Sequence, residues 1–437
     1  MTERWMDRRS FMATGVAGLA GGGLAGGGLG ASVGADAGPK AAPPVAGAPV
    51  DVQSAEPRDL FPRVREQTFL NAAGGTPLGA FAEQGIERYL DFIRHGPAGG
   101  RGEYFGEVMS GVRPRFAALI GADEDEIGLV ECTKAGEQIA IDGLDALHAH
   151  GNVVTNDLHF SGSLHNYEGL ARSGIDVRVV QAGDAWRVTA ERMIDAMDDR
   201  TALVAVSLVS NVNGHVEPIA ELSEAAHAQG AIVFADVIQA AGAIPIDVRA
   251  LGIDVAATSS YKWLFGIHGA GFLYVRRELQ GTVLPDRLFP GHVRRNYPPW
   301  TDTPDPAIGR FAYSPPAAAV RYQPGHVSYL GYAAVYEGLR FIERMGGPEA
   351  INRRTAALRA RLLDQLDTDR YRVLTPDPAR TPILSLQPRT TEGLVDRLVA
   401  ANVVVSVGGD MERLIRISPA VYNDASDIDR LAEVLAG

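Results

Sequence analysis

Short apolar runs rich in β-branched residues alternate with amphipathic stretches through the middle of the chain. The stretch 219–230 between two such runs has helical spacing of its apolar residues and closes on a glycine, which suits the end of a helix. This alternation predicts a largely parallel sheet with helices on both faces. The predicted strands are 152–157, 176–181, 202–210, 231–236, 253–259 and 269–277. Ligands of such sheets collect at the carboxyl ends of the strands.

Polar side chains follow three neighbouring strands of this predicted sheet. Asp236 ends one apolar run, with Gln239 about one turn later, while Lys262 lies just past the next run and Asn211 just past the preceding one. Three strand ends therefore offer an amide, an acid and an amine to one crevice. The alternative for Lys262 is a surface lysine whose stem covers apolar groups. Its small, aromatic and apolar neighbours favour a site instead.

An anion seat is predicted upstream, where the helical stretch 131–150 begins. Thr133 opens this helix, and Ala135 and Gly136 leave its first amides uncovered. Free amides at a helix start bind phosphate, although a threonine there also serves as a simple cap. Ser259 and Tyr261, which lie beside Lys262 in sequence, provide further donors for the same anion.

Composition limits the classes of ligand. The chain has 437 residues, enough for two domains, and a formal net charge of −12 at pH 7. An acidic protein without a basic stripe is poorly suited to nucleic acid or to an anionic membrane surface. We therefore expect a small-molecule ligand. No histidine, cysteine and acid cluster has metal-ligand spacing, so no metal site is predicted.

The first sixty residues are expected to lie outside the fold. Arg8 and Arg9 precede a weakly apolar glycine- and alanine-rich run, which looks like a twin-arginine export signal over 1–37, and a proline- and alanine-rich linker follows over 38–60. A flexible low-complexity tail is the alternative. The glycine-diluted run is unsuited to a permanent membrane anchor.

A single cysteine, Cys132, agrees with export of an already folded protein, because it permits no intramolecular disulfide. We therefore expect the Tat translocon as a partner, cofactor loading in the cytoplasm, and a periplasmic or extracellular location.

Taken together, these residues resemble the class V aminotransferase group of fold-type I pyridoxal-phosphate (PLP) enzymes, which includes cysteine desulfurases, kynureninase and isopenicillin-N epimerase-like proteins. The resemblance runs from about residue 60 to the C-terminus and implies an α/β fold. Its large, mainly parallel PLP-binding domain would span 61–310, and a smaller α+β domain, to which the N-terminal segment contributes, would span 311–437. The matching stretches are "TFLNAAGGTPLG", "TKAGEQI", "TNDLHF", "SLVSNVNGHVEPI", "ADVIQAAGAIPIDVRALGIDVAATSSYKWLFGIHGAGFLYV", "QPGHVSYLG" and "RLIRISPAVYND".

The resemblance implies a role for each polar residue at the strand ends. Lys262 matches the Schiff-base lysine, whose freed amine moves the Cα proton of the substrate. Asp236 matches the acid that keeps the pyridine nitrogen protonated, so that the ring becomes an electron sink. Gln239 and Asn211 match residues that hydrogen-bond the 3-oxygen of the ring.

Further residues are assigned to the cofactor and the substrate by the same resemblance. The phosphate cradle would be formed by Thr133, Ala135, Gly136, Ser259 and Tyr261. Phe160 would stack on the ring, with His159 as the competitor for that place. Substrate contacts would come from Arg416, which would grip the carboxylate, and from Asn71, Gly74 and His159.

The resemblance also implies a homodimer, with His326 reaching the phosphate of the neighbouring subunit. A plain loop histidine is the alternative for His326.

These residues predict a PLP-dependent enzyme that acts on an α-amino acid through an external aldimine and a Cα carbanion, with epimerase-like or lyase-like chemistry. An aminotransferase is the alternative. A persulfide-forming cysteine desulfurase is expected to be excluded, because Cys132 precedes the phosphate helix and no cysteine lies near the C-terminus. The alternatives from other classes are a secreted non-catalytic binding protein and a nucleotide-binding dehydrogenase. Intact Lys262, Asp236 and Arg416 disfavour the first, and a missing glycine fingerprint after a first strand disfavours the second.

Overall fold

A computed structural model describes residues 54–96, 104–285, 294–295, 313–314, 318–376, 378, 380–408 and 414–437. The expected export signal at 1–37 lies outside these residues, as does the expected linker up to residue 53. Within the described ranges, no helix combines the length and the apolarity needed to cross a membrane.

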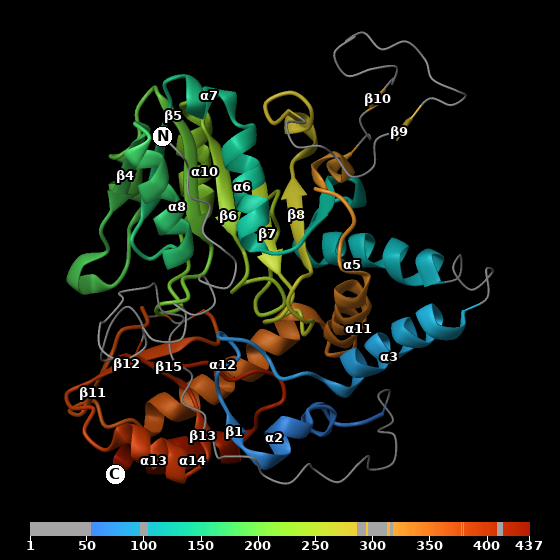
Figure 1. The fold of residues 1–437 in the computed structure, drawn as a ribbon. Coiled ribbons are helices and arrows are strands. Elements are labelled where there is room, and N and C mark those ends of the chain that lie inside the picture. Colours follow the sequence, from blue (N-terminus) through green and yellow to red (C-terminus); the bar gives the residue numbers. More distant parts are fainter. Residues whose placement is uncertain are drawn as a thin grey trace, which may run out of the picture.

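A seven-stranded sheet forms the larger part of the molecule (Figure 1). Its strand order is β2-β8-β7-β6-β5-β3-β4; the pairs from β7 to β4 are parallel, whereas β8 runs antiparallel to both of its neighbours. The strands are β2 (Ile127–Val130), β3 (Asn152–Asn156), β4 (Asp176–Val180), β5 (Thr201–Ser207), β6 (Ile232–Asp236), β7 (Val255–Ser259) and β8 (Gly271–Val275). All six strands expected from the sequence are present, and β2 is the added one.

Both faces of this sheet are buried, which explains the continuous apolar runs. Leu203 and Ala205 of β5 belong to one apolar cluster, whereas Val204 and Val206 belong to the other. Helices pack on both sides, as a parallel sheet requires. They are α5 (Ser110–Ile120), α6 (Thr133–Gly143), α7 (Asp145–Ala149), α8 (Ser161–Arg172), α9 (Ala190–Ile194) and α10 (Ile219–Ala228).

Helix α6 lies unusually close to the sheet. A Cβ atom added at Gly136 would stand 2.6 Å from the Cβ of Ala257 in β7. Only glycine therefore fits at this position without a shift of the helix. The contact holds the first turn of α6 beside the carboxyl end of β7.

A second, antiparallel sheet with its own apolar core is built mainly from the C-terminal part of the chain. Its strand order is β11 (Tyr371–Val373), β12 (Leu384–Pro388), β15 (Ile415–Ile417) and β14 (Ser406–Val407), and it is accompanied by α12 (Gly347–Gln365), α13 (Leu394–Ala400) and α14 (Ala425–Ala436). Near the other end of the chain, β1 (Thr68–Phe69) pairs in parallel with β13 (Val403–Val404). The segment around β1 thus lies beside the C-terminal part (Figure 1).

Long helices stand beside the large sheet, where α3 (Ala80–His95) lies along α11 (Tyr329–Arg344) (Figure 1). The remaining short elements are α2 (Pro62–Glu66), the 3₁₀ turns η1 (Pro57–Leu60), η3 (Glu124–Glu126), η4 (Gly183–Ala185), η5 (Arg277–Leu279) and η7 (Ala319–Tyr322), the π-helical turn η2 (Phe105–Met109), and the strand pair β9 (Arg294–Arg295) and β10 (Tyr313–Ser314).

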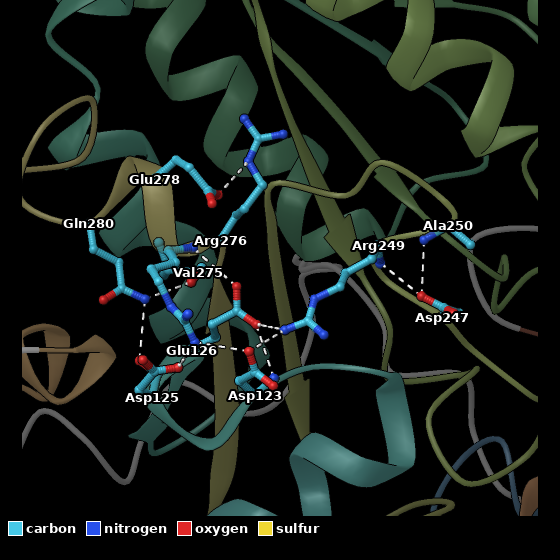
Figure 2. Close-up of polar contacts among 11 residues, drawn as sticks. Asp123, Asp125, Glu126, Asp247, Arg249, Ala250, Val275, Arg276, Glu278 and Gln280 are labelled. Carbon is cyan, nitrogen blue, oxygen red and sulfur yellow. Dashed lines mark hydrogen bonds and ion pairs between the residues drawn. The ribbon is translucent and has the colours of Figure 1, made fainter.

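An ion-pair network ties the amino edge of the large sheet together (Figure 2). The carboxylate of Glu126, which is 3% exposed, accepts hydrogen bonds from the side chain of Arg249 at 2.8 Å and from the backbone amides of Asp123 at 3.0 Å and Arg277 at 3.1 Å. These groups come from the segment before β2, the loop between β6 and β7, and the segment after β8. The network therefore fastens the antiparallel edge of the sheet.

Replacing Glu126 by alanine should lower the free energy of unfolding by about 2–4 kcal/mol, because two backbone amides lose their acceptor and the Arg249 guanidinium keeps only Asp123. Urea unfolding measures the change. The matched control is Asp125→Ala, which removes an exposed carboxylate 2.7 Å from Arg277 and should cost under about 1 kcal/mol. Equal losses in the two variants would contradict the assignment of this role to Glu126.

Candidate active site

Lys262 lies three residues past the end of β7 and is buried, with only 7% of its surface exposed. The backbone around it is fixed by Thr76, whose hydroxyl donates to the carbonyl oxygen of Lys262 at 2.9 Å and whose amide donates to that of Tyr261. Burial lowers the pKa of the Lys262 amine, and the nearby Arg416 charge lowers it further, to about 7, against the opposing effect of Asp236. The amine is therefore partly neutral near pH 7.

Asp236 and Arg416 bring opposite charges to this amine from different sheets. Asp236 is the last residue of β6 and is 2% exposed; burial raises its pKa, while the charge of His159 opposes that rise. Arg416 lies in β15 of the second sheet, and burial lowers its pKa to about 10. Its guanidinium donates to the carbonyl oxygen of Asn211 at 2.8 Å, which fastens the second sheet to the loop after β5.

Gln239 connects two segments of the site through hydrogen bonds of its side-chain amide. Its Nε2 donates to the carbonyl oxygen of Ala73 at 2.9 Å, and its Oε1 accepts from Nε1 of Trp263, the neighbour of Lys262, at 2.8 Å. One Nε2 hydrogen remains for a ligand. The assigned contact with a ring oxygen stays a prediction, because both amide atoms also hold the protein together.

The predicted phosphate residues meet at the start of α6. Thr133 is its first residue; its amide donates to the Ser259 hydroxyl at 3.0 Å, and the two hydroxyl oxygens lie 3.1 Å apart. The close seat of Gly136 on β7 and the adjacent Ala135 keep this first turn at the strand ends. The structure thus brings the expected helix start and Ser259 together.

Tyr261, the remaining phosphate candidate, stacks on a histidine. Its ring lies 3.9 Å from that of His268, nearly parallel at 14°, and its centroid is 5.6 Å from Nζ of Lys262. Burial raises the pKa of the Tyr261 phenol, so the group stays neutral at pH 7.

The geometry favours His159 over Phe160 for the place above the strand ends. His159 is 1% exposed, and its Nδ1 lies 2.8 Å from the hydroxyl of Ser207, which pairs across the sheet with Asp236. Phe160 is partly exposed and stands at the N-cap of α8. The expectation that Phe160 is the stacking residue receives no support from this arrangement.

The other expected site residues are placed less uniformly. Asn71 is buried and forms an isolated β-bridge with Ser418, the residue after β15. Gly74 is exposed, and a Cβ atom added there would lie 2.8 Å from Oδ1 of Asn71. His326 is exposed before α11, where its Nδ1 lies 3.4 Å from the Tyr329 hydroxyl. Its expected contact with a neighbouring subunit stays a prediction.

Several buried polar atoms in this region have no hydrogen-bond partner in the protein, which supports a fit to PLP. Oδ1 of Asn71, Oδ1 of Asn211 and Nε of Arg416 are buried without a hydrogen-bond partner. Such atoms are costly unless something binds them. Together with a low-pKa amine, a buried acid and a helix start, they match the aldehyde, the ring nitrogen and the phosphate of PLP. Within the described ranges, no group of three or more His, Cys, Asp or Glu residues could hold a metal ion.

Two buried glutamates near these strand ends were not predicted as site residues from the sequence. Glu137 of α6 is 1% exposed and contacts His159, and Glu217 is 4% exposed and accepts from Asn156, the last residue of β3. Burial raises the pKa of Glu217 to about 8. In the sequence, the only signal for Glu137 is its position inside the phosphate-helix stretch "TKAGEQI". A glutamate there is equally typical of the exposed face of a helix.

Comparisons with known proteins place these features in a family. A protein of Methanothermobacter thermautotrophicus named a probable cysteine desulfurase is 34% identical over 241 residues, which are 54% of this chain and 59% of that protein. Among solved structures, the apo cysteine desulfurase from Thermococcus onnurineus NA1 has a TM-score of 0.75 and 21% identity, covering 86% of this chain and 96% of that one. A structure described as the cystine C-S lyase C-DES with its reaction product cysteine persulfide has a TM-score of 0.76 and 20% identity, covering 86% and 99%.

These names correct one expectation. The exclusion of a persulfide-forming cysteine desulfurase was wrong, because the relatives and structural neighbours include proteins named cysteine desulfurases. The exclusion assumed that a protein cysteine must carry the sulfur.

The fold neighbours confirm the expected fold-type I α/β architecture, and the family confirms PLP as the expected cofactor. The model of the family described as Aminotransferase class-V matches residues 93–431. The chain therefore belongs to the aminotransferase class-V family.

Proposed function

We propose that this protein is a PLP-dependent enzyme that cleaves the carbon–sulfur bond of a sulfur-containing α-amino acid such as cysteine or cystine. The observation that carries the PLP chemistry is the buried Lys262 amine, with a pKa near 7, between Asp236 and Arg416 at the carboxyl edge of a parallel sheet. Of the epimerase-like and lyase-like reactions expected from the sequence, the lyase-like one is supported by the name of one structural neighbour, the cystine C-S lyase.

Each charged residue has a defined task in this proposal. When bound, PLP supplies an electron sink for the electron pair of the broken Cα–H bond. Lys262 accepts the Cα proton as a neutral amine, which its low pKa makes available near pH 7. Arg416 pairs with the substrate carboxylate, since its guanidinium forms a fork that matches two oxygens. Asp236 holds the proton of the ring nitrogen.

The proposed elimination balances without a further oxidant or reductant. The Cα proton and the sulfur on Cβ leave, and water then releases the remaining fragment. Cystine and water give pyruvate, ammonia and cysteine persulfide, and cysteine gives pyruvate, ammonia and hydrogen sulfide. Desulfuration would instead leave alanine, with the sulfur transferred to an acceptor. The nitrogen-containing product therefore reports the route.

The loaded enzyme should release sulfur from L-cystine or L-cysteine, measured together with pyruvate, ammonia and alanine. Lys262→Ala should lower this rate at least about a hundredfold, because the base for the Cα proton is lost. Arg353→Ala, which removes an exposed cation on α12, is the control for general damage. Cys132→Ser shows whether the only cysteine receives the sulfur. Amino transfer to a keto acid, or inversion at Cα, without sulfur release would contradict the proposal.

The pH dependence of cofactor loading tests the charge environment of Lys262. The rate at which the apoprotein takes up PLP, followed by visible absorption, should rise about tenfold per pH unit below pH 7 and level off above it, because only the neutral amine reacts. Arg416→Met should move this midpoint to higher pH, since a cation that disfavours the protonated amine is gone. Arg416→Lys keeps the cation and should move it less. A midpoint near the ordinary lysine pKa in the unaltered protein would contradict the assigned environment.

We also propose export by the Tat route, supported by Arg8 and Arg9 before the glycine- and alanine-rich run and by the single cysteine. Fusing residues 1–60 to a folded reporter should deliver the reporter across the cytoplasmic membrane. Replacing both arginines by lysine should abolish that delivery. Delivery that persists in the double variant would contradict the proposal.

A further inference from the structure

A buried hydrogen-bond network lies directly behind His159, on the side of α6 and α8. The carboxylate of Glu137 accepts from the hydroxyl of Tyr167 at 2.8 Å on Oε1, and from the hydroxyl of Ser163 at 2.6 Å and the ammonium of Lys134 at 2.7 Å on Oε2. Nε2 of His159 lies 3.2 Å from Oε1 of the same carboxylate. Four groups thus converge on one glutamate that is 1% exposed.

The ionisation of this glutamate is set by its neighbours. Burial raises the pKa of Glu137, but the hydrogen bond and charge of His159, followed by those of Lys134, outweigh it and lower the pKa to about 2. Glu137 is therefore a carboxylate near pH 7. Tyr167 faces it as a neutral phenol, because burial raises the pKa of Tyr167 well above its ordinary value.

An ionised carboxylate only accepts hydrogen bonds, so it fixes the proton on the facing nitrogen of His159. Nε2 must carry a hydrogen to bond with Glu137, whether the imidazole is neutral or charged. The second nitrogen, Nδ1, lies 2.8 Å from the hydroxyl of Ser207, which donates to a neutral ring and accepts from a protonated one. Any change in the charge of His159 therefore takes place at Nδ1, on the side of β5.

The charged and titratable groups around His159 come from every element packed against it. Lys134 and Glu137 lie on α6, Tyr167 on α8, with its ring centroid 6.0 Å from that of His159, and Asp236 at the end of β6. Lys134 and Glu137 compensate each other. Asp236 lies on the opposite side; burial raises its pKa, and the charge of His159 opposes that rise. His159 thus links the Glu137 network to the predicted partner of the ring nitrogen.

We propose that Glu137 is a positioning residue that holds the proton on Nε2 of His159 and fixes the plane of its imidazole at the carboxyl edge of the sheet. That the fixed plane faces a cofactor ring rests on the proposed function. With both nitrogens engaged in the plane of the imidazole, the ring resists rotation and keeps a constant orientation toward the site. Glu137 acts through His159 and has no contact of its own with Lys262 or Arg416 among the described residues.

The direct test is nitrogen-15 NMR of the imidazole rings in the apoprotein, where neither cofactor nor substrate is needed. His159→Gln identifies the signals of His159. In the unaltered protein we expect the neutral ring to carry its proton on Nε2. A proton on Nδ1 with a bare Nε2 would overturn the proposal. This measurement uses the unaltered protein. It therefore tests the proposal even if variants of Glu137 do not fold.

Glu137→Gln gives the second arm of the test. A glutamine amide can accept from a ring N–H or donate to a bare ring nitrogen, so the tautomer with its proton on Nδ1 should become detectable in this variant. The control Ser163→Ala removes one donor to Glu137 but keeps the carboxylate, so the neutral ring should keep its proton on Nε2. A neutral ring that still carries its proton on Nε2 alone in folded Glu137→Gln would overturn the proposal. Because the spectra are recorded on the apoprotein, the result does not depend on whether the loaded enzyme cleaves a carbon–sulfur bond.

Discussion

The burial of one amine at the edge of a parallel sheet is the constraint on which the rest of the structure depends. Lys262 is 7% exposed and lies close enough to Arg416 for that cation to lower its pKa. Removing an ammonium from water is costly unless it loses its proton, so the fold favours the neutral amine. A neutral amine near pH 7 is the chemical requirement for attack on an aldehyde and for abstraction of a Cα proton.

Both sheets are needed to create this environment. The large sheet supplies Lys262 and Asp236 from adjacent strand ends, whereas the cation comes from β15 of the second sheet and is fastened to the loop after β5 by the bond from Arg416 to the Asn211 carbonyl. The ion pairs centred on Glu126 lie at the opposite, amino edge of the large sheet. Charges at that edge hold strands together, whereas at the carboxyl edge Nε of Arg416 and the amide oxygens of Asn71 and Asn211 are buried without a hydrogen-bond partner, which suits a ligand.

The sequence was sufficient for the strands and for most of the residues at their ends, because apolar runs and the polar residue after each run are local patterns. Asp236 and Lys262 follow their strands directly, so the parallel topology alone brings them together. The sequence could not decide whether Phe160 or His159 stacks on the ring. The two residues are adjacent, and a shift of one position along the chain reverses which side chain points inward. Glu137 was missed because its burial depends on α8 and on the histidine beyond β3, both distant in sequence.

Reduction of the loaded protein with borohydride, followed by peptide mapping, tests the central claim most directly. The chain contains three lysines, Lys40, Lys134 and Lys262, so the attachment site is unambiguous. Lys134 is paired with Glu137 at 2.7 Å, whereas Lys262 is buried with a lowered pKa. We expect the pyridoxyl group on Lys262 alone. Its recovery on Lys134 or Lys40, or on no lysine, would contradict the account.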